Sequence, residues 1–472
     1  MIFRRLYHDR LAQASYLIAC EATRQAIVID PLRDPSVYVK AAEFEDVRIA
    51  CVTETHVHAD FLSGAEALAR LVGAELMLSG ECDADEASAR MRRSGAKPLL
   101  DGGVISVGRV RLDVRHTPGH TPEHLIFIVT DETTSQLPVG IVSGDFLFAG
   151  DVGRPDLLER AVGVAGSMQQ SAQDLYRSLQ SVRDLPDYVQ LWPGHGAGSA
   201  CGKSLGAVPQ STLGYELRTN WAFQIDDEQE FVRAVLADQP EPPAYFARMK
   251  QLNTIGAPPL TDPLRADEPM LRDQVRSGAL VVDTRAPEEF IARHLEGAIS
   301  IPLGRSVLTW AGSVLDPTRD LILLMSPGEM HEADPLARDL ALIGYDRVLG
   351  ALPAIGLESF SPRRVANIPY RQMSELAAGV GDATVLDVRS STEWSEGHIP
   401  GAVNVPLAEL TLRMAELRER QPIVTYCQSG ARSTVAASVL RAAGIVDVSN
   451  AEGGFDEWTR IGAATAVAGR GR

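Results

Sequence analysis

The stretch that decides the fold of the N-terminal half is RIACVTETHVHADF, residues 48–61. Its first part, RIACV, has the length and the apolar, β-branched composition of a buried strand. The polar residues follow directly, at a strand end where a loop can direct them into a cleft. In an extended loop, His56, His58 and Asp60 point the same way because they are spaced i, i+2, i+4. The stretch predicts a cluster of imidazoles and a carboxylate at one sheet edge.

Similar strand-end contexts occur three more times along the chain. His120 lies in TPGHTPEH, Asp145 in IVSGD and His195 in LWPGH. Imidazole nitrogens and carboxylate oxygens are ligands of divalent transition metals. A lone histidine is more often structural, but the recurrence of such residues at strand ends favours a metal site.

The order of these motifs resembles that of the metallo-β-lactamase superfamily. The pattern is H-x-H-x-D, a PGHT histidine, GD and a final histidine, matched over about residues 1–240. The resemblance implies an αββα sandwich, which agrees with the alternation of strand-like and helical text in this region. The two nearest branches are glyoxalase II-like thioester hydrolases and persulfide dioxygenases. The hydrolases carry a further histidine after the aspartate, where this chain has Phe61, so we expect one metal ion rather than two.

The resemblance also implies which residues bind the ion. Two histidines and one carboxylate, with the other positions open, are typical of non-haem Fe(II) oxygenases. The open positions can hold O₂ beside the terminal sulfur of a persulfide, whereas zinc could only activate water. We therefore predict one Fe(II) in this domain. The expected ligands are His56, His120 and Asp145, and the expected neighbours of these ligands are His58, Asp60 and His195.

Two further residues of this domain are candidates for substrate chemistry. Arg154, in GDVGRPDL, resembles part of the family's G-R-x-D loop. It can meet an anionic substrate group or form a buried structural pair with Asp156. Cys201 follows His195 closely enough to reach the cleft. We hypothesise that its thiol holds or relays a persulfide, with a passive thiol as the alternative.

The second half of the chain contains an internal repeat. VVDTRAPEEFIARHLEGAISIPL (281–303) aligns without a gap on VLDVRSSTEWSEGHIPGAVNVPL (385–407), and each copy continues with an apolar strand, a short loop and a helix-like run. This pattern predicts two copies of one α/β domain with a parallel sheet. A proline-rich, patternless segment before the repeat predicts a linker. The expected divisions are the metal domain 1–240, the linker 241–261, the first copy 262–362, the second copy 363–465 and a frayed tail 466–472.

Cys427 opens the loop CQSGAR, between the strand-like PIVTY and the helix-like STVAASVLRAAG. Backbone N–H groups, a helix N-terminus and Arg432 all favour the thiolate, which is the nucleophilic form of cysteine. Together with DVR, GHIPGA and EGGFDEW, this loop resembles the rhodanese family, in which the cysteine accepts a sulfane sulfur as a persulfide. The resemblance implies Cys427 and Arg432 as catalytic residues. It also implies that the intervening residues bind the anion: Gln428, Ser429, Gly430 and Ala431.

The first copy departs from this pattern at the two decisive positions. Ser326 stands where the second copy has Cys427, and His331 stands where it has Arg432. A serine cannot carry a sulfane sulfur, so we expect this copy to be catalytically silent and to serve as a packing module.

The order of the three domains resembles the persulfide dioxygenase–rhodanese fusions of bacterial sulfide detoxification. That resemblance implies oxidation of a low-molecular-weight thiol persulfide by O₂ to sulfite, followed by sulfur transfer from Cys427 to sulfite, which gives thiosulfate. Two alternatives remain open. One is a glyoxalase II-like thioester hydrolase with an accessory rhodanese, and the other is a non-enzymatic role of the rhodanese copies as sulfur carriers or docking modules.

The composition narrows the partners and the compartment. A length of 472 residues fits about three domains. The net charge of −17 disfavours nucleic acid and anionic lipid as partners. No apolar run reaches the roughly 18 residues of a membrane span. Five scattered cysteines (20, 51, 82, 201 and 427) without a C-x-x-C pair favour a reducing, cytoplasmic setting. We expect a thiol persulfide, O₂ and sulfite as partners, and the resemblance leaves a homo-oligomer open.

Overall fold

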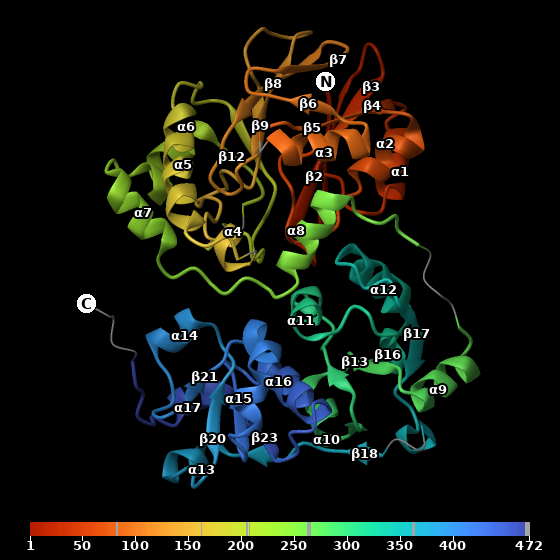
Figure 1. Ribbon diagram of the computed structural model, residues 1–472, viewed down its shortest axis with the longest axis vertical. Helices are drawn as coiled ribbons and strands as arrows, with labels where there is room; N and C mark the ends of the chain where they lie inside the picture. Colours follow the sequence, from red (N-terminus) through yellow and green to blue (C-terminus); the bar gives the residue numbers. More distant parts are fainter. Residues whose placement is uncertain are drawn as a thin grey trace. The chain divides into compact units, whose positions relative to one another are not determined.

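The computed structural model describes residues 1–81, 84–161, 163–203, 206, 208–261, 266–360 and 364–467. Cys82, to which the sequence assigns no role, and the last part of the tail lie outside these ranges. The chain divides into two compact units, residues 1–260 and 261–472, and each is described by itself (Figure 1). Among the described residues, no helix is both long enough and apolar enough to cross a membrane.

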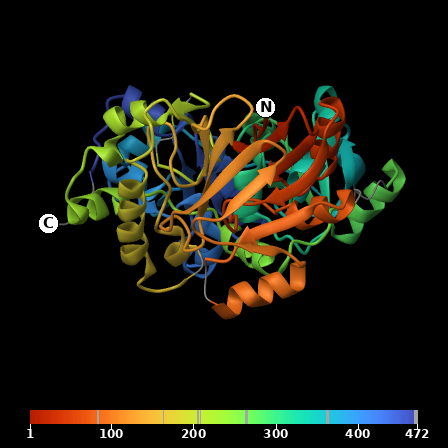
Figure 2. The ribbon, with the colours of Figure 1, turned by 90° about the horizontal axis from the view of Figure 1, so that it is seen from above.

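The first unit contains two six-stranded sheets, which Figure 2 shows from above. The first sheet has the order β1 (Ile2–His8), β2 (Gln13–Cys20), β3 (Gln25–Ile29), β4 (Arg48–Thr53), β5 (Glu75–Ser79) and β6 (Lys97–Leu99). The second sheet has the order β12 (Ser211–Thr212), β11 (Gln190–Pro193), β10 (Gly140–Gly144), β9 (Leu125–Asp131), β8 (Val110–His116) and β7 (Val104–Val107).

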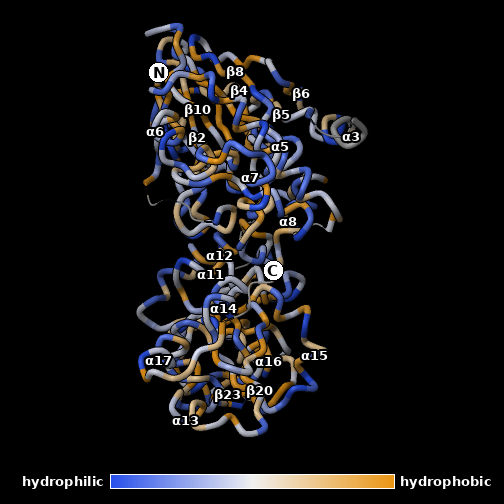
Figure 3. Tube along the Cα trace, turned by 90° about the vertical axis from the view of Figure 1, so that its left-hand side faces the viewer, coloured by the Kyte–Doolittle hydropathy of each residue, from blue (hydrophilic) through white to orange (hydrophobic). Residues whose placement is uncertain are grey.

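The strand sequences explain why these sheets stack with helices on both outer faces. Every residue of β2 is buried, which is expected of a strand covered on both sides. Because side chains alternate along a strand, Tyr16 and Ile18 pack in the core between the two sheets. Leu17 and Ala19 pack in the core beneath the outer helices. In Figure 3 hydrophobic colouring accordingly follows strands such as β10.

The helices of this unit form the two outer layers of an αββα sandwich. Residues of α1 (Ser36–Phe44) and α2 (Ala65–Val72) pack on the first sheet. Residues of α5 (Ser167–Ser181) and α7 (Glu228–Leu236) pack on the second sheet. The remaining helices are α3 (Ala84–Ser94), α4 (Leu157–Arg160) and α6 (Leu213–Thr219).

The segment 241–261, which the sequence predicts to be a patternless linker, contains regular structure in its middle part. A helix, α8 (Phe246–Ile255), forms there, with Phe246 and Met249 buried on one face. The prolines on both sides of this short apolar spacing concealed it in the sequence. Arg33, fully buried, donates hydrogen bonds of 3.0 and 3.1 Å to the carbonyl oxygens of the prolines that follow α8. The segment is therefore packed onto the first unit.

The second unit contains two larger sheets whose strand orders correspond. The first has the order β15 (Ile299–Ser300), β13 (Leu280–Asp283), β16 (Leu321–Met325) and β17 (Val348–Pro353). The second has the order β21 (Val403–Asn404), β20 (Thr384–Asp387), β22 (Ile423–Tyr426), β23 (Val448–Ala451) and β19 (Tyr370–Arg371). All pairs within both sheets are parallel. A two-stranded ribbon pairs β14 (His294–Leu295) with β18 (Val365–Ala366).

The helices of the second unit follow the strands in the same alternation. Those of the first copy are α9 (Glu268–Ser277), which precedes β13, and α10 (Pro287–Ala292), α11 (Val307–Val314) and α12 (Ala333–Leu342). Those of the second copy are α13 (Met373–Ala378), α14 (Ser391–Glu396), α15 (Met414–Arg418), α16 (Ala431–Ala442) and α17 (Gly454–Arg460). Short 3₁₀ turns η2 (Pro327–Glu332) and η4 (Leu407–Arg413) complete the loops used below.

Candidate functional sites

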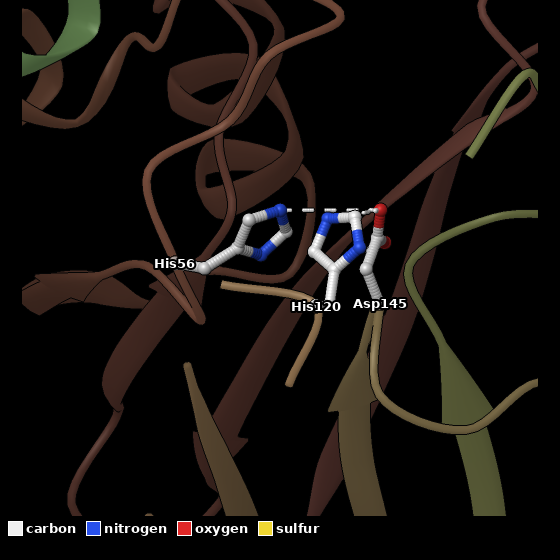
Figure 4. Close-up of side chains that lie close together, drawn as sticks. All are labelled: His56, His120 and Asp145. Atoms are coloured by element: carbon white, nitrogen blue, oxygen red, sulfur yellow. Dashed lines mark ion pairs between the residues drawn. The ribbon is translucent and has the colours of Figure 1, made fainter. Parts of the chain in front are cut away.

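The candidate metal-site residues of the first unit, which include the expected neighbour His195, follow the carboxyl ends of four strands. His56 follows β4, His120 follows β8, Asp145 follows β10 and His195 follows β11. The structure brings His56, His120 and Asp145 together, with their ligand atoms within 4.8 Å of one another and all three residues buried. The Oδ2 atom of Asp145 lies 3.5 Å from Nε2 of His120 and 3.9 Å from Nε2 of His56 (Figure 4).

Glycines allow this close approach. A Cβ atom at Gly194, the residue before His195, would lie 2.7 Å from Oδ1 of Asp145. A Cβ atom at Gly144, which has a φ of +51°, would lie 2.6 Å from the Thr55 hydroxyl. Real side chains do not tolerate such distances. The glycines of the GD and PGH motifs therefore let the backbone at Gly144 approach the Thr55 side chain and the backbone at Gly194 approach the Asp145 side chain.

Hydrogen bonds on the far side of each imidazole set its orientation. His120 donates from Nδ1 to the carbonyl oxygen of Arg154 at 3.1 Å, because a carbonyl can only accept. The Thr55 hydroxyl donates to Asp30 at 2.9 Å, so the same oxygen accepts the Nδ1–H of His56, also at 2.9 Å. Both imidazoles consequently present a bare Nε2 towards Asp145. A hydrogen bond from the ring N–H that does not face the metal fixes the tautomer of a metal-binding histidine.

A second group of buried residues adjoins the first. Ligand atoms of Asp60, His195 and Cys201 lie within 4.8 Å of one another. Nε2 of His195 is 3.3 Å from Oδ2 of Asp145 and 3.5 Å from Oδ2 of Asp60, while its Nδ1 donates to a backbone carbonyl. Burial is the largest influence and opposes protonation of His195, but the charges of Asp145, Cys201 and Asp60 together outweigh it and raise the pKa of His195 well above its usual value. Burial raises the pKa of the Cys201 thiol to about 12.

The side chains present fit a metal ion. Several of their polar atoms are buried without a hydrogen-bond partner: both carboxylate oxygens of Asp145 and Asp60, Nε2 of His195 and Nδ1 of His58. Unpaired buried charges are costly, and a divalent cation among them supplies the missing counter-charge. Imidazole nitrogens and carboxylate oxygens are suitable ligands for such a cation. Phe61 is fully buried, with its ring centroid 4.3 Å from that of His58, and offers no ligand atom.

Three residues that support this site were not singled out in the sequence. Asp30 accepts from the backbone N–H of Thr55 at 2.6 Å and lies 3.2 Å from His58 Nε2. His124 accepts the backbone N–H of Asp145 at 3.1 Å, and burial lowers the pKa of His124 to about 3, which keeps it neutral. Asn253 of α8 donates to backbone carbonyls in the His58–Phe61 loop. Only His124 had a local signal, as the second histidine of TPGHTPEH.

Arg154 forms the buried structural pair with Asp156, which was one of the two roles considered for it. Its side chain is completely buried and donates to both oxygens of Asp156, at 2.8 and 3.1 Å. It also donates to the carbonyl oxygens of Ala200 and Pro240. With these donors engaged inside the protein, the predicted contact with substrate is not supported. Arg154 instead fixes the backbone that carries its own carbonyl, the acceptor for His120.

The Cys427 loop lies between β22 and α16. Cys427 is buried, and the backbone N–H of Gly430 donates to its sulfur at 3.1 Å. Arg432 forms a two-point ion pair with Glu393, at 2.6 and 2.7 Å, so its charge is already partnered. The Gln428 side chain accepts from Arg389 at 3.2 Å and donates to Asp456. Because the Gln428 side chain is engaged by Arg389 and Asp456, only the backbone N–H of this residue is available to bind an anion.

The corresponding loop of the first copy is built differently. Ser326 precedes the 3₁₀ turn η2, and the His331 side chain is 73% exposed. The scaffold beneath the loop is nevertheless the same in both copies. Arg285 donates to both oxygens of Asp283, as Arg389 does to those of Asp387. The copies thus share their framework and differ in the loop.

Comparisons with known proteins concern the two domains that carry these candidate sites. A model of the metallo-beta-lactamase superfamily matches residues 8–195, and a model of the rhodanese-like domain matches 372–461. A solved metallo-beta-lactamase structure from Staphylococcus aureus subsp. aureus COL is 41% identical, with a TM-score of 0.68, and the match covers 75% of this chain and 99% of that chain. The chain therefore belongs to the metallo-beta-lactamase superfamily and carries a rhodanese-like domain in its C-terminal part.

Two curated relatives align with the separate parts. The mitochondrial persulfide dioxygenase ETHE1 of Bos taurus is 26% identical over 201 residues, which are 41% of this chain and 68% of that protein. A sulfurtransferase of Allochromatium vinosum is 35% identical over 98 residues, which are 21% of this chain and 92% of that protein. The predicted fold class, a metallo-β-lactamase sandwich followed by rhodanese-like structure, is confirmed.

Proposed function

We propose that the chain joins an iron-dependent persulfide dioxygenase to a rhodanese-type sulfurtransferase. The observation that carries this proposal is the buried set of two imidazoles and one carboxylate, His56, His120 and Asp145, in a domain similar to a persulfide dioxygenase. Two histidines and a carboxylate with open positions are the ligand set of non-haem Fe(II) oxygenases. Bound there, iron would supply the redox chemistry that lets O₂ react with a persulfide sulfur. The overall reaction is RSSH + O₂ + H₂O → RSH + H₂SO₃.

The protein's own residues would prepare this site in three ways. Thr55 and the Arg154 carbonyl hold the two imidazoles with Nε2 facing Asp145. Phe61 replaces a ligand by a buried apolar ring, which favours one metal position over two. His195 lies beside both Asp145 and Asp60 and can hold a proton close to the reacting groups.

Cys201 is proposed to hold or relay a persulfide next to the metal centre. Its sulfur is in the same buried cluster as Asp60 and His195, which supports a role of this thiol close to the metal centre. Because burial raises its pKa, the thiol needs the positive charge of His195 to ionise. Cys201→Ser tests the role, and unchanged turnover and product distribution would remove it.

Sulfur transfer is assigned to Cys427. Its thiolate would attack the terminal sulfur of a second persulfide, release a thiol and become a cysteine persulfide. Sulfite would then attack that outer sulfur, giving thiosulfate and regenerating the Cys427 thiolate. The Gly430 N–H donates to the sulfur and α16 begins directly after it, so both direct positive charge towards the position where an anionic substrate group would bind.

Metal analysis combined with O₂ uptake on glutathione persulfide tests the proposal. We expect iron in the purified protein and O₂ consumption that matches sulfite formed. Cys427→Ser should retain O₂ uptake and sulfite but lose thiosulfate, whereas Cys20→Ser, at a thiol in the other unit, should retain both activities. Absence of O₂ uptake by iron-loaded protein would refute the dioxygenase assignment.

The rival functions make different predictions. A glyoxalase II-like hydrolase would turn over thioesters without O₂, and Phe61 is the sequence feature against it. A purely carrier or docking role of the rhodanese copies would leave thiosulfate formation unchanged in Cys427→Ser. The same set of assays separates all three.

A further inference from the structure

Helix α8 contacts the loop that carries the metal-ligand motif through one buried side chain. Asn253 is 5% exposed and donates to the carbonyl oxygens of His58 and Phe61, at 2.8 and 2.7 Å. It also accepts the backbone N–H of Ser63 at 2.9 Å. An asparagine amide has two N–H donors, and both are used on carbonyl oxygens here, so these partners fix its orientation. Asn253 therefore binds the backbone on both sides of Asp60.

The two halves of the motif loop are held by different groups. The first half, which contains the expected ligand His56, is held by buried carboxylates. They accept the backbone N–H groups on either side of this histidine, at 2.6 Å (Thr55 to Asp30) and 2.9 Å (Val57 to Glu123). The second half, which contains Asp60, is held by Asn253 and by a backbone bridge from Leu32 to Ser63. A change at Asn253 should therefore displace Asp60 and leave His56 in place.

The Asp60 side chain makes no hydrogen bond of its own within the part of the chain that the structure describes. Both of its carboxylate oxygens lack a partner there, although the residue is buried. Its Oδ2 atom lies 3.5 Å from Nε2 of His195, and the same nitrogen lies 3.3 Å from Oδ2 of Asp145. The distance between Asp60 and His195 is therefore set by the backbone that Asn253 holds.

Helix α8 is a firm support for this purpose. Phe246 and Met249 are buried on one of its faces. The fully buried Arg33 donates to the carbonyl oxygens of Pro258 and Pro259, which follow the helix, at 3.0 and 3.1 Å. The helix is thus fixed on the first unit by contacts that do not involve the motif loop.

We propose that Asn253 is a positioning residue of the dioxygenase site, which sets the place of Asp60 beside His195. This inference rests on the proposed function and adds to it a residue from a segment that the sequence predicts to be a linker. Loss of the amide leaves two buried carbonyl oxygens without donors, and the loop must move to bring them to water. Asp60 moves with the loop, and displacement of a group close to the reacting atoms lowers turnover.

A double-mutant cycle tests whether Asn253 acts through Asp60. Asn253→Leu keeps the approximate size of the side chain and removes all three hydrogen bonds. We expect it to lower kcat for O₂ uptake with glutathione persulfide by roughly 10- to 100-fold, with KM and metal affinity little changed. Asp60→Asn alone should cause a loss of the same order, and adding Asn253→Leu to it should have almost no further effect on kcat. Equal fold-losses with and without Asp60→Asn would overturn the proposal.

Asn220→Leu is the matched control. Asn220 is also buried in the first unit, where it donates to the Asp151 carbonyl oxygen and the Glu216 carboxylate, at 3.1 and 2.9 Å, and accepts the Ala222 N–H at 3.1 Å. Its replacement removes the same set of hydrogen bonds elsewhere in the unit. Both variants should lower the unfolding midpoint by similar amounts, but only Asn253→Leu should lower kcat. An equal loss of kcat in the two variants would contradict a positioning role.

Crystal structures of the Zn²⁺-loaded variants report the geometry without turnover. We expect the distance between Oδ2 of Asp60 and Nε2 of His195 to exceed 3.5 Å in Asn253→Leu and to be retained in Asn220→Leu. Asn253→Ala, whose smaller side chain lets water reach the two carbonyl oxygens, should shift it in the same direction and replaces the leucine variant if that protein does not fold. An unchanged distance would overturn the role of Asn253. Absence of O₂ uptake by the wild type would refute the proposed function, and the distance would still decide the role of Asn253.

Discussion

Replacing Thr55 by valine removes one hydroxyl from the support of the metal centre and keeps the shape of the side chain. That hydroxyl donates to Asp30 and accepts from His56, both at 2.9 Å, and all three side chains are buried. Its loss leaves a carboxylate oxygen and an imidazole N–H without partners and frees His56 to adopt the other tautomer. Loss of such a supporting contact typically weakens metal affinity by about 10–100-fold, which corresponds to about 1.4–2.7 kcal/mol.

The metal-free protein should also lose stability. A buried group left unsatisfied costs about 1–3 kcal/mol. Asp30 keeps its bond from the Thr55 N–H and its contact with His58, so we expect about 2 kcal/mol in total. Competition between the protein and a chromophoric chelator for Zn²⁺, used as a redox-silent probe, measures the affinity. Denaturant unfolding of the metal-free protein measures the stability.

Thr53, the last residue of β4 and two positions before Thr55, offers a matched control. It is completely buried, and its hydroxyl has no hydrogen-bond partner. Thr53→Val makes the identical chemical change and should leave metal affinity unchanged and stability unchanged or slightly higher. Equal affinities in the Thr55 and Thr53 variants would refute the claim that the Thr55 hydroxyl orients His56.

Two more predictions concern the Cys427 loop. Burial opposes ionisation of Glu393, but the hydrogen bonds and charge of Arg432 outweigh it and lower the pKa of Glu393 to about 2 from 4.5. The pair therefore stabilises the fold fully above pH 4.5 and stops doing so as the pH falls through 2. Glu393→Gln should cost about 1–2 kcal/mol at pH 7, after a discount for partial exposure, and the cost should shrink towards pH 2 in urea unfolding; a pH-independent cost would contradict it. Gly454→Ala would place a Cβ atom 2.5 Å from the Cys427 carbonyl oxygen and should abolish thiosulfate formation, whereas Gly462→Ala, also at positive φ but with no atom within 4 Å, should cost only about 1 kcal/mol of stability; equal losses of sulfur transfer would argue against the steric explanation.

The sequence was sufficient to predict the fold class and the placement of the metal-ligand residues, because both depend on short-range patterns. Strand-end motifs predict where His56, His120 and Asp145 lie, and parallel or neighbouring strands bring such ends to one edge. The support of these residues depends on distant pairs instead. Asn253 contacts a loop about 190 residues earlier in the chain, and no local pattern in the proline-rich segment indicates that contact.

The difference between short-range patterns and contacts that are distant in sequence also explains why the structure gives Arg154 and Gln428 other partners than an anion. The sequence leaves Arg154 open between an anionic substrate group and a buried pair with Asp156, and the rhodanese resemblance assigns Gln428 to anion binding. Their actual partners include the Pro240 carbonyl oxygen and the Asp456 carboxylate, which are remote in sequence and adjacent only after folding. A motif therefore predicts where a side chain lies more reliably than which of its donors remain free.

The first copy of the repeat packs against the second copy, and this packing does not depend on the residues at Ser326 and His331. Every residue of α16 from Ser433 to Leu440 is buried, and a helix buried on all sides cannot face solvent. The covering surface comes partly from the first copy. Its strand β15 packs on α16, and the Ser300 N–H donates to the Ser438 hydroxyl at 3.0 Å. Because α16 begins directly after the Gly430 N–H that contacts Cys427, the geometry of the active loop depends on a domain that lacks the cysteine itself.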